Sequence, residues 1–289
     1  MEKISDYGKN VLRETLFLLD DVCKKLNIKF YLSHGTLLGA VKYKGFIPWE
    51  DDLDVMMSRK DYSRLKDYIL SHPNEEYGIG FAECGYFSPD FFGKFFNKKY
   101  LCLEEGCLLT HPWADIYILS PVREKELKNY CGKLKWGISI TGLANRKVRY
   151  TDWYDSDLKI WFYNNFHRKS VLPKKYAEKY FYRILTEYEN KNADSYLLMS
   201  PGVFHMIDEK LYKKEWFLGE DKTVEFEGRK FLAPCMYDTI LKTGYGDYMN
   251  TLPPENEQKP KHGTLFLNDG EHFVCSYAYP EEIRLSENK

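Results

Sequence analysis

The sequence predicts an α+β fold with a mixed β-sheet flanked by helices. Two kinds of observation support this prediction. Residues 4–26 repeat apolar side chains at helical spacing, which indicates an amphipathic helix with one face suited to cover a sheet. Short segments at residues 28–32, 53–57 and 113–119 have the apolar character and the length of strands. Helix and strand signals therefore alternate in the first half of the chain.

Local signals place further elements between and after these segments. Residues 36–41 indicate a short helix, and Ser58-Arg59-Lys60-Asp61 reads as a capping box for a helix that ends near Leu70. Residues 123–195 have a mostly helical pattern that is interrupted near Pro173.

The C-terminal part of the sequence returns to strand signals. Residues 223–232 alternate about Glu227-Gly228, which predicts a hairpin, and residues 236–242 predict a helix. A strand and tail with a turn at residues 268–270 follow. We expect a catalytic core over residues 1–122, a helical, basic and aromatic elaboration over residues 123–195, and a section over residues 196–289 that closes the site.

Composition narrows the class of protein. With 289 residues, 44% hydrophobic and 17% aromatic, the chain has the material for a large core and is not disordered. No apolar segment is long enough to span a bilayer and no secretory leader is evident, so we expect a cytoplasmic protein, with peripheral contact at the inner face of the membrane as a further option. Seven irregularly spaced cysteines fit a reducing compartment, with ordinary thiols as the default and a zinc site as the alternative. That zinc site would use Cys84, Cys102, Cys107 and His111.

The net charge of −1 is the sum of two opposite parts. Residues 123–183 contain 15 Lys and Arg against 6 Asp and Glu, and the rest of the chain is acidic. Aromatic residues lie between these cations, namely Trp136, Trp153, Trp161, Phe162 and Phe166. The pattern is compatible with contact with an anionic membrane surface or a polyanionic acceptor, but a solvated helical face is the favoured interpretation, because runs of charge usually have that role. We expect no nucleic-acid partner, because no recognised binding motif accompanies the basic residues.

An acidic pair indicates metal-dependent phosphoryl transfer. Asp52 and Asp54 are separated by one residue, so on a strand both carboxylates face one side while Leu53 and Val55 face the other. Carboxylates placed in this way suit Mg²⁺, with Mn²⁺ as the alternative, and the bound cation would neutralise a diphosphate.

A turn rich in small residues precedes the acidic pair. Backbone N–H groups at Gly35 and Thr36 would face a phosphate, although Gly35 is equally explained by tight packing. His34 either orients substrate or is structural, and Lys42 and Lys44 either balance phosphate charge or are ordinary surface lysines. Neither a Walker-type nor a Rossmann glycine pattern is present, which argues against a P-loop kinase.

The same segments resemble the LicD family of the nucleotidyltransferase-fold superfamily, which includes proteins similar to fukutin-related protein. The resemblance rests on five segments between about residues 25 and 265: Gly35–Val41, Gly45–Asp54, Trp113–Tyr117, Phe226–Phe231 and Tyr245–Pro254. It implies a nucleotidyltransferase-like sheet with Asp115 as a third acid, which either binds a second metal or takes the acceptor proton.

Other family positions have weaker implications. Glu50 and Asp51 occupy acidic positions of the family pattern, but a turn role explains them as well. Arg229 and His262 have no evident role, and Asp247 is better explained as a turn residue than as a metal ligand.

The resemblance implies an enzyme that moves phosphocholine from CDP-choline to a sugar hydroxyl of a teichoic acid, capsule or lipopolysaccharide, with a lipid-linked acceptor as one option. One alternative is another CDP-alcohol donor, with ribitol or glycerol phosphate transferred. The others are nucleotidyl transfer to a small acceptor and a non-catalytic carbohydrate-binding protein.

Overall fold

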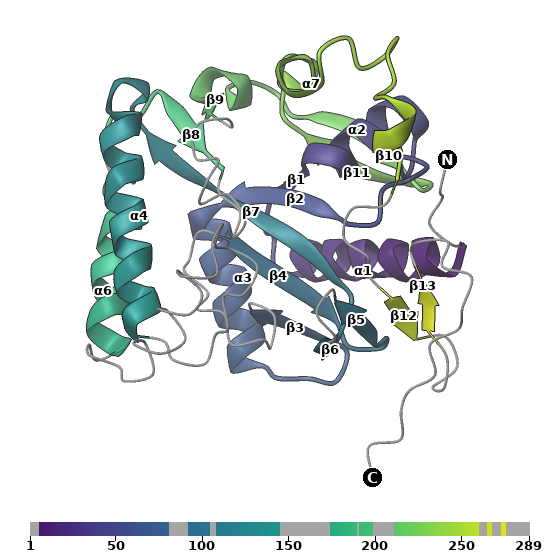
Figure 1. Cartoon of the computed structure of the whole chain (residues 1–289), viewed down its shortest axis with the longest axis horizontal. Helices are drawn as coiled ribbons and strands as arrows, with labels where there is room; N and C mark the ends of the chain where they lie inside the picture. The colour runs from purple at the N-terminus through teal and green to yellow at the C-terminus, as the bar shows by residue number, and fades with distance from the viewer. Residues whose placement is uncertain are drawn as a thin grey trace. The chain divides into compact units, whose positions relative to one another are not determined.

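The computed structural model describes residues 6–80, 92–104, 108–144, 174–189, 191–198, 211–259, 265–267 and 273–275. Helices and a mixed sheet confirm the α+β class (Figure 1). The chain divides into two compact units: unit 1 comprises residues 1–80, 94–116 and 216–289, and unit 2 comprises residues 81–93 and 117–215. This division follows packing, so the functional boundaries expected at residues 122 and 195 stay a prediction.

The elements of the N-terminal half follow the predicted order, with more strands than expected. They are α1 (Asp6–Lys25), β1 (Phe30–Leu32), α2 (His34–Tyr43), β2 (Asp54–Ser58), α3 (Arg59–Ser71), β3 (Tyr77–Gly80), β4 (Phe92–Asn97), β5 (Cys102–Glu104), β6 (Leu108–Thr110) and β7 (Trp113–Val122). The later elements are η1 (Glu124–Glu126), α4 (Leu127–Ala144), α6 (Lys174–Leu185), β8 (Ser195–Leu197), β9 (Leu211–Lys213), η3 (Lys214–Phe217), β10 (Lys222–Phe226), β11 (Arg229–Ala233), α7 (Tyr237–Tyr245), η4 (Glu255–Glu257), β12 (Leu265–Leu267) and β13 (Phe273–Cys275).

The main sheet has the strand order β1-β2-β7-β4-β3, with β8 and β9 continuing from β7. Strands β1 and β2 pair antiparallel, as do β3 and β4. A second sheet has the order β13-β12-β5-β6. The pairing of β12 with β13 confirms the strand signals near the C-terminus, and the turn expected at residues 268–270 lies outside the described residues.

Helix α1 confirms the amphipathic prediction and buries Val11, Leu12, Leu16 and Leu19. Helix α3 begins as the capping box predicts, because the Asp61 backbone N–H donates to the Ser58 hydroxyl oxygen at 3.1 Å. Both helices are therefore fixed by local sequence as well as by packing.

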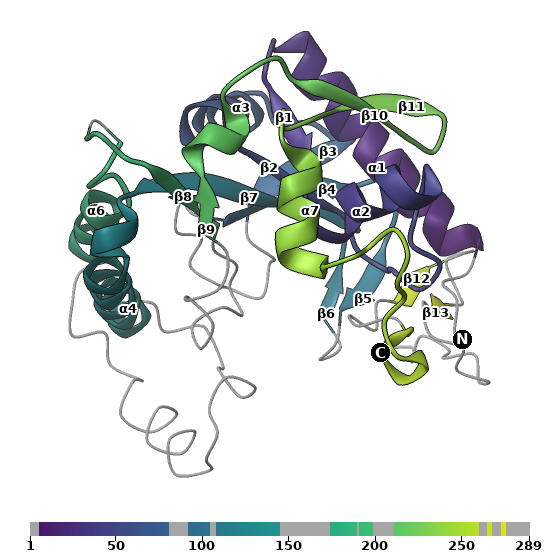
Figure 2. The same cartoon turned by 90° about the horizontal axis from the view of Figure 1, so that it is seen from above.

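The β10–β11 hairpin turns at Glu227-Gly228, as predicted, and contacts two N-terminal elements of unit 1 (Figure 2). The Glu227 backbone N–H donates to the Lys44 carbonyl oxygen at 2.8 Å. Arg229 Nη1 lies 3.1 Å from Asp20 Oδ2 and 2.7 Å from Asp21 Oδ1, on α1. Arg229 thus has a structural role that the sequence did not reveal.

In unit 2, α4 and α6 pack together over buried Tyr130, Leu134, Phe181 and Leu185. A Cβ atom at Gly137 would lie 2.6 Å from the Phe181 ring, so glycine allows the two helices to approach closely. The described part of residues 123–195 is mainly helical, as expected, and ends in β8. Pro173 lies outside the described residues.

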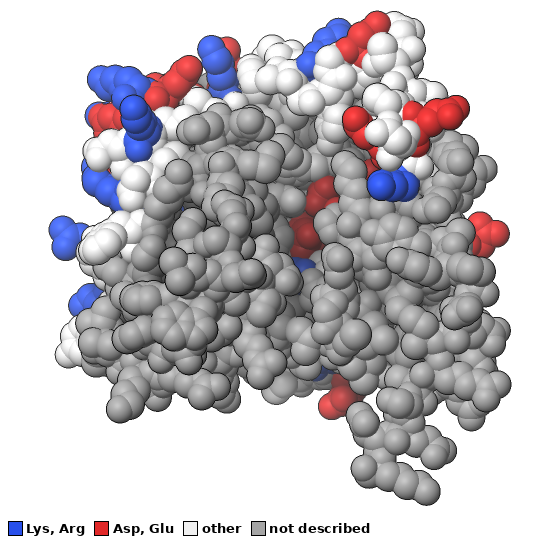
Figure 3. Space-filling model, in the orientation of Figure 1, with Lys and Arg blue, Asp and Glu red and all other residues white. Residues whose placement is uncertain are grey.

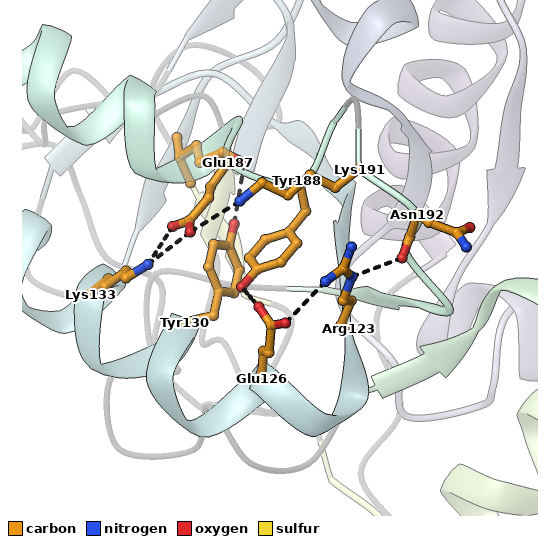
Figure 4. Close-up of polar contacts among 9 residues, drawn as sticks. Arg123, Glu126, Tyr130, Lys133, Glu187, Tyr188, Lys191 and Asn192 are labelled. Carbon is orange, nitrogen blue, oxygen red and sulfur yellow. Dashed lines mark hydrogen bonds and ion pairs between the residues drawn. The ribbon is translucent and has the colours of Figure 1, made fainter.

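A polar network connects η1 and the start of α4 with the segment that follows α6 (Figure 4). The Tyr188 hydroxyl donates to the Glu126 carboxylate, which also pairs with Arg123. Lys133 forms an ion pair with Glu187 at 2.8 Å. Burial, followed by the bond to Glu126, raises the pKa of Tyr188 to about 12, so this tyrosine stays protonated as a donor at neutral pH.

Among the described residues, no helix has the length and apolar character required to cross a membrane.

We predict that Arg229→Met destabilises the fold by about 1–3 kcal/mol, because Asp20 is buried and loses a charged partner. Arg13→Met is the matched control. It removes a half-exposed partner 4.0 Å from Glu227 and should cost about 0.5 kcal/mol or less. Urea unfolding of both variants measures the difference, and equal losses would contradict the clamping role of Arg229.

Candidate active site

Three carboxylates gather at the beginning of β2 in unit 1. Oxygen atoms of Glu50, Asp52 and Asp54 lie within 4.8 Å of one another. Asp54 is buried and is the first residue of β2, while Glu50 and Asp52 are half-buried in the preceding loop. The structure therefore brings together two of the three predicted metal ligands, Asp52 and Asp54, and adds Glu50, for which the sequence analysis left a site role and a turn role open.

Apolar anchors hold the loop that contains these acids. Phe46, Ile47, Trp49 and Leu53 are buried. The Phe46 ring meets the Phe226 ring of the hairpin edge-on, with centroids 4.9 Å apart. Because these side chains point into the core of unit 1, the loop is tied down on both sides of Glu50.

The start of α2 fixes the backbone at Asp54. The Asp54 N–H donates to the Thr36 hydroxyl oxygen at 2.8 Å, and the Asp54 carbonyl oxygen accepts from the Ser33 N–H at 3.0 Å. Both backbone polar groups of Asp54 are thus held by residues just before and inside the first turn of α2. Thr36, expected to contact substrate, supports a metal-ligand candidate in this structure.

Gly35 lies directly against the Glu50 carboxylate. A Cβ atom at position 35 would be 2.4 Å from Glu50 Oε1, so only glycine leaves the carboxylate in place. Gly35 is in the first turn of α2, which begins two residues earlier than predicted. The positive end of the helix dipole is there, and it favours a neighbouring carboxylate.

His34 begins α2 with a left-handed backbone, φ 41°, which is strained for a residue other than glycine. Its side chain is buried, and Nδ1 lies 2.7 Å from the Ser33 hydroxyl oxygen. The strained residue thus lies between Ser33, which bonds to Asp54, and Gly35, which contacts Glu50.

Asp115 extends the acidic group onto the neighbouring strand. Its backbone N–H donates to the Leu53 carbonyl oxygen at 2.7 Å. Strands β2 and β7 are neighbours and run in the same direction in Figure 1. In a parallel ladder, this bond places Asp115 beside Asp54, with both side chains on one face of the sheet.

Lys94 contacts Asp115 and was not identified from the sequence. Its ammonium lies 3.8 Å from Asp115 Oδ1 and 3.5 Å from the centroid of the Trp113 ring. The available signal was a lysine in the middle of the aromatic segment Phe-Phe-Gly-Lys-Phe-Phe, where a surface lysine is unexpected.

The two lysines expected near phosphate lie at the other end of α2. Lys42 Nζ donates to the carbonyl oxygens of Tyr248, at 2.6 Å, and Thr251, at 2.8 Å. Lys44 is exposed and ends the helix in a left-handed conformation. Lys42 therefore holds the segment after α7, and the structure does not bring either lysine to the acidic group.

The remaining candidates have separate places. Asp51 is buried in the acidic loop. Asp247 accepts from the Asn250 side chain, at 3.0 Å, and confirms the turn role. His262 lies outside the described residues. Of the four possible zinc ligands, Cys84 and Cys107 also lie outside them, while Cys102 is buried and His111 Nδ1 lies 2.8 Å from the Tyr100 carbonyl oxygen.

The donor set fits a hard divalent cation. Three carboxylates within reach of one ion, with Asp115 beside them, offer the oxygen ligands that Mg²⁺ and Mn²⁺ prefer. Acidic side chains are also seen at the centre of the face in Figure 3. Chemically, such a group can bind a cation that neutralises a diphosphate and leave a carboxylate on β7 for a proton.

Comparison with known proteins relates the chain to one family. Residues 27–130 match the family model of the LicD/FKTN/FKRP nucleotidyltransferase domain. The chain is 29% identical over 251 residues to the lipopolysaccharide cholinephosphotransferase LicD of Haemophilus influenzae, covering 83% of this chain and 89% of that protein. It is 32% identical over 85 residues to an uncharacterised protein of Rickettsia prowazekii, covering 28% of this chain and 32% of that one.

We predict that Gly35→Ala weakens Mn²⁺ binding roughly three- to tenfold with little loss of stability, because the new methyl group displaces the flexible end of Glu50. Gly39→Ala is the contrasting variant. The new Cβ atom would lie 2.4 Å from the Gly45 carbonyl oxygen, a backbone atom that has little room to move. The Gly39→Ala variant should therefore lose about 1–3 kcal/mol of stability. Calorimetric Mn²⁺ titration and urea unfolding separate the two effects. Wild-type Mn²⁺ affinity in Gly35→Ala would argue against Glu50 as a ligand.

Proposed function

We propose that this chain, whose residues 27–130 belong to the LicD family of nucleotidyltransferase domains, transfers phosphocholine from CDP-choline to a sugar hydroxyl of a cell-surface glycan. The observation on which this rests is the carboxylate group at the start of β2, which has the ligands for a cation that binds a diphosphate. The similarity to a lipopolysaccharide cholinephosphotransferase over most of both chains supports the choice of phosphocholine and favours lipopolysaccharide over teichoic acid or capsule.

Each acidic residue has a role in this proposal. Glu50, Asp52 and Asp54 would hold Mg²⁺ or Mn²⁺, which supplies charge neutralisation for the diphosphate. The acceptor hydroxyl oxygen forms a bond to the phosphorus that bears choline, the bond from that phosphorus to the CMP oxygen breaks, and CMP leaves. Asp115 takes the proton from the hydroxyl, or binds a second metal in the alternative role.

Three alternatives make different products or none. Another CDP-alcohol donor would give a ribitol or glycerol phosphate product with the same CMP leaving group. Nucleotidyl transfer would leave the nucleotide on the acceptor and release pyrophosphate or another phosphorylated group. A carbohydrate-binding protein without activity is disfavoured by the assembled carboxylates, which such a protein has no need to bring together.

We also propose a peripheral location at the inner face of the membrane, where a lipid-linked acceptor would be available. Helix α6 supports it, because Tyr176, Lys179, Tyr180 and Arg183 are exposed at spacings of three and four residues and so share one face. Tyrosines beside cations suit the headgroup layer of an anionic membrane. Of the aromatic residues singled out in this region, Trp136 on α4 is described and is also exposed.

We predict that the protein binds CDP-choline when Mg²⁺ is present and that EDTA abolishes this binding. Asp52→Asn or Asp54→Asn should lower kcat at least about a thousandfold while the fold is retained. Asp67→Asn, at an exposed aspartate of α3, is the matched control and should behave as wild type. Titration of CDP-choline, CDP-ribitol, CDP-glycerol and CMP identifies the donor. Substantial turnover in either site variant would refute the assignment.

We predict that the protein binds vesicles with phosphatidylglycerol at low salt and releases them at high salt, because the attraction is electrostatic. Replacing Lys179 and Arg183 together with Glu should abolish binding, whereas Lys60→Glu with Lys222→Glu, at exposed positions of unit 1, should not. Flotation with neutral phosphatidylcholine vesicles is the reference. Equal binding by both double variants would rule out the α6 face.

A further inference from the structure

Lys94 is a buried cation that lies against Trp113 and Asp115. Its residue is 7% exposed, on a strand whose six residues are all buried. The ammonium lies 3.5 Å from the centroid of the Trp113 ring and 3.8 Å from Asp115 Oδ1. Trp113 and Asp115 are two residues apart on β7, so their side chains share one face of the sheet, and Lys94 lies against both.

Burial of an ammonium group is costly, and an apolar side chain of similar length would pack on β4 without that cost. Lys94 therefore contributes something that packing alone does not require. Its charge faces a carboxylate that lies beside Asp54, where the other acidic side chains repel that carboxylate. The aromatic face of Trp113 attracts the ammonium and holds it in place.

We propose that Lys94 is a positioning residue for the transfer reaction: it holds the Asp115 carboxylate in place beside the Glu50, Asp52 and Asp54 group, and Trp113 fixes Lys94. This inference rests on the proposed function, because it takes the role of Asp115 from it. Lys94 acts through Asp115, and the substrate is not required to touch it.

The proposal has an electrostatic consequence that distinguishes it from simple packing. A buried positive charge next to the acidic group opposes a bound divalent cation, and burial reduces screening by salt. Removal of Lys94 should therefore strengthen metal binding while it slows turnover, because Asp115 loses its fixed position. A variant that merely folds badly would weaken both.

The test compares Lys94→Met, Lys94→Arg, Asp115→Asn and the double variant Lys94→Met/Asp115→Asn. Lys99→Met is the matched control, because it removes a lysine that pairs with a carboxylate, Glu14, on the surface of the same unit. For each protein we would measure thermal unfolding, Mn²⁺ affinity by calorimetry, and kcat and KM for CDP-choline.

We expect Lys94→Met to bind Mn²⁺ roughly three- to tenfold more tightly, to lose at least about tenfold in kcat, and to change KM little. Lys94→Arg should recover part of kcat. In the Asp115→Asn background, Lys94→Met should lower kcat little further, because both substitutions act through the Asp115 carboxylate. Lys99→Met should match wild type.

Unchanged or weaker Mn²⁺ binding in folded Lys94→Met, or fully additive losses in kcat, would overturn the positioning role. If wild type turns over no CDP-choline, the proposed function fails. The inference is then judged by Mn²⁺ affinity alone, where tighter binding supports the placement of Lys94 beside the acidic group and unchanged affinity overturns it.

Discussion

Repulsion among carboxylates is the constraint on which the site depends. Charges 4.8 Å apart at an effective dielectric constant of 20 repel by on the order of 3 kcal/mol per pair. The protein holds them together by fixing the backbone. The Asp54 N–H donates to the Thr36 hydroxyl oxygen, and the Asp54 carbonyl oxygen accepts from the Ser33 N–H. The Asp115 N–H donates to the Leu53 carbonyl oxygen. The Gly35 backbone leaves room for Glu50. These backbone bonds keep the acidic residues close together, and a bound divalent cation would relieve the repulsion among their carboxylates.

The acidic loop also depends on residues far along the chain. Phe226 packs on Phe46, and the Glu227 N–H bonds the Lys44 carbonyl, so the β10–β11 hairpin supports the segment between α2 and Glu50. Arg229 ties the same hairpin to α1. The core expected over residues 1–122 thus includes contacts from residues 222–233, and the C-terminal section supports the loop through ring packing and a backbone hydrogen bond.

Local elements were predictable and long-range contacts were not. The capping box at Ser58 and the turn at Glu227-Gly228 depend on neighbouring residues, so the sequence was sufficient for both. Strand β4 was missed because all its residues are buried, which removes the alternation that marks a half-exposed strand. The Asp52 and Asp54 pair was visible as a pattern, whereas the bonds of Lys42 to carbonyls more than 200 residues away, and the contact of Lys94 with Asp115, depend on the fold.

In the proposed reaction, recognition of the diphosphate is separate from recognition of the alcohol. In the proposed reaction, the carboxylates and a cation would bind the diphosphate that every CDP-alcohol shares, so this part of the site would be the same for choline, ribitol or glycerol donors. Choline differs by its quaternary ammonium, which aromatic faces attract. The face of Trp113 toward Lys94 is already occupied by an ammonium group, and Phe46 packs on Phe226. If the donor is CDP-choline, as proposed, aromatic faces other than these would have to select the choline group.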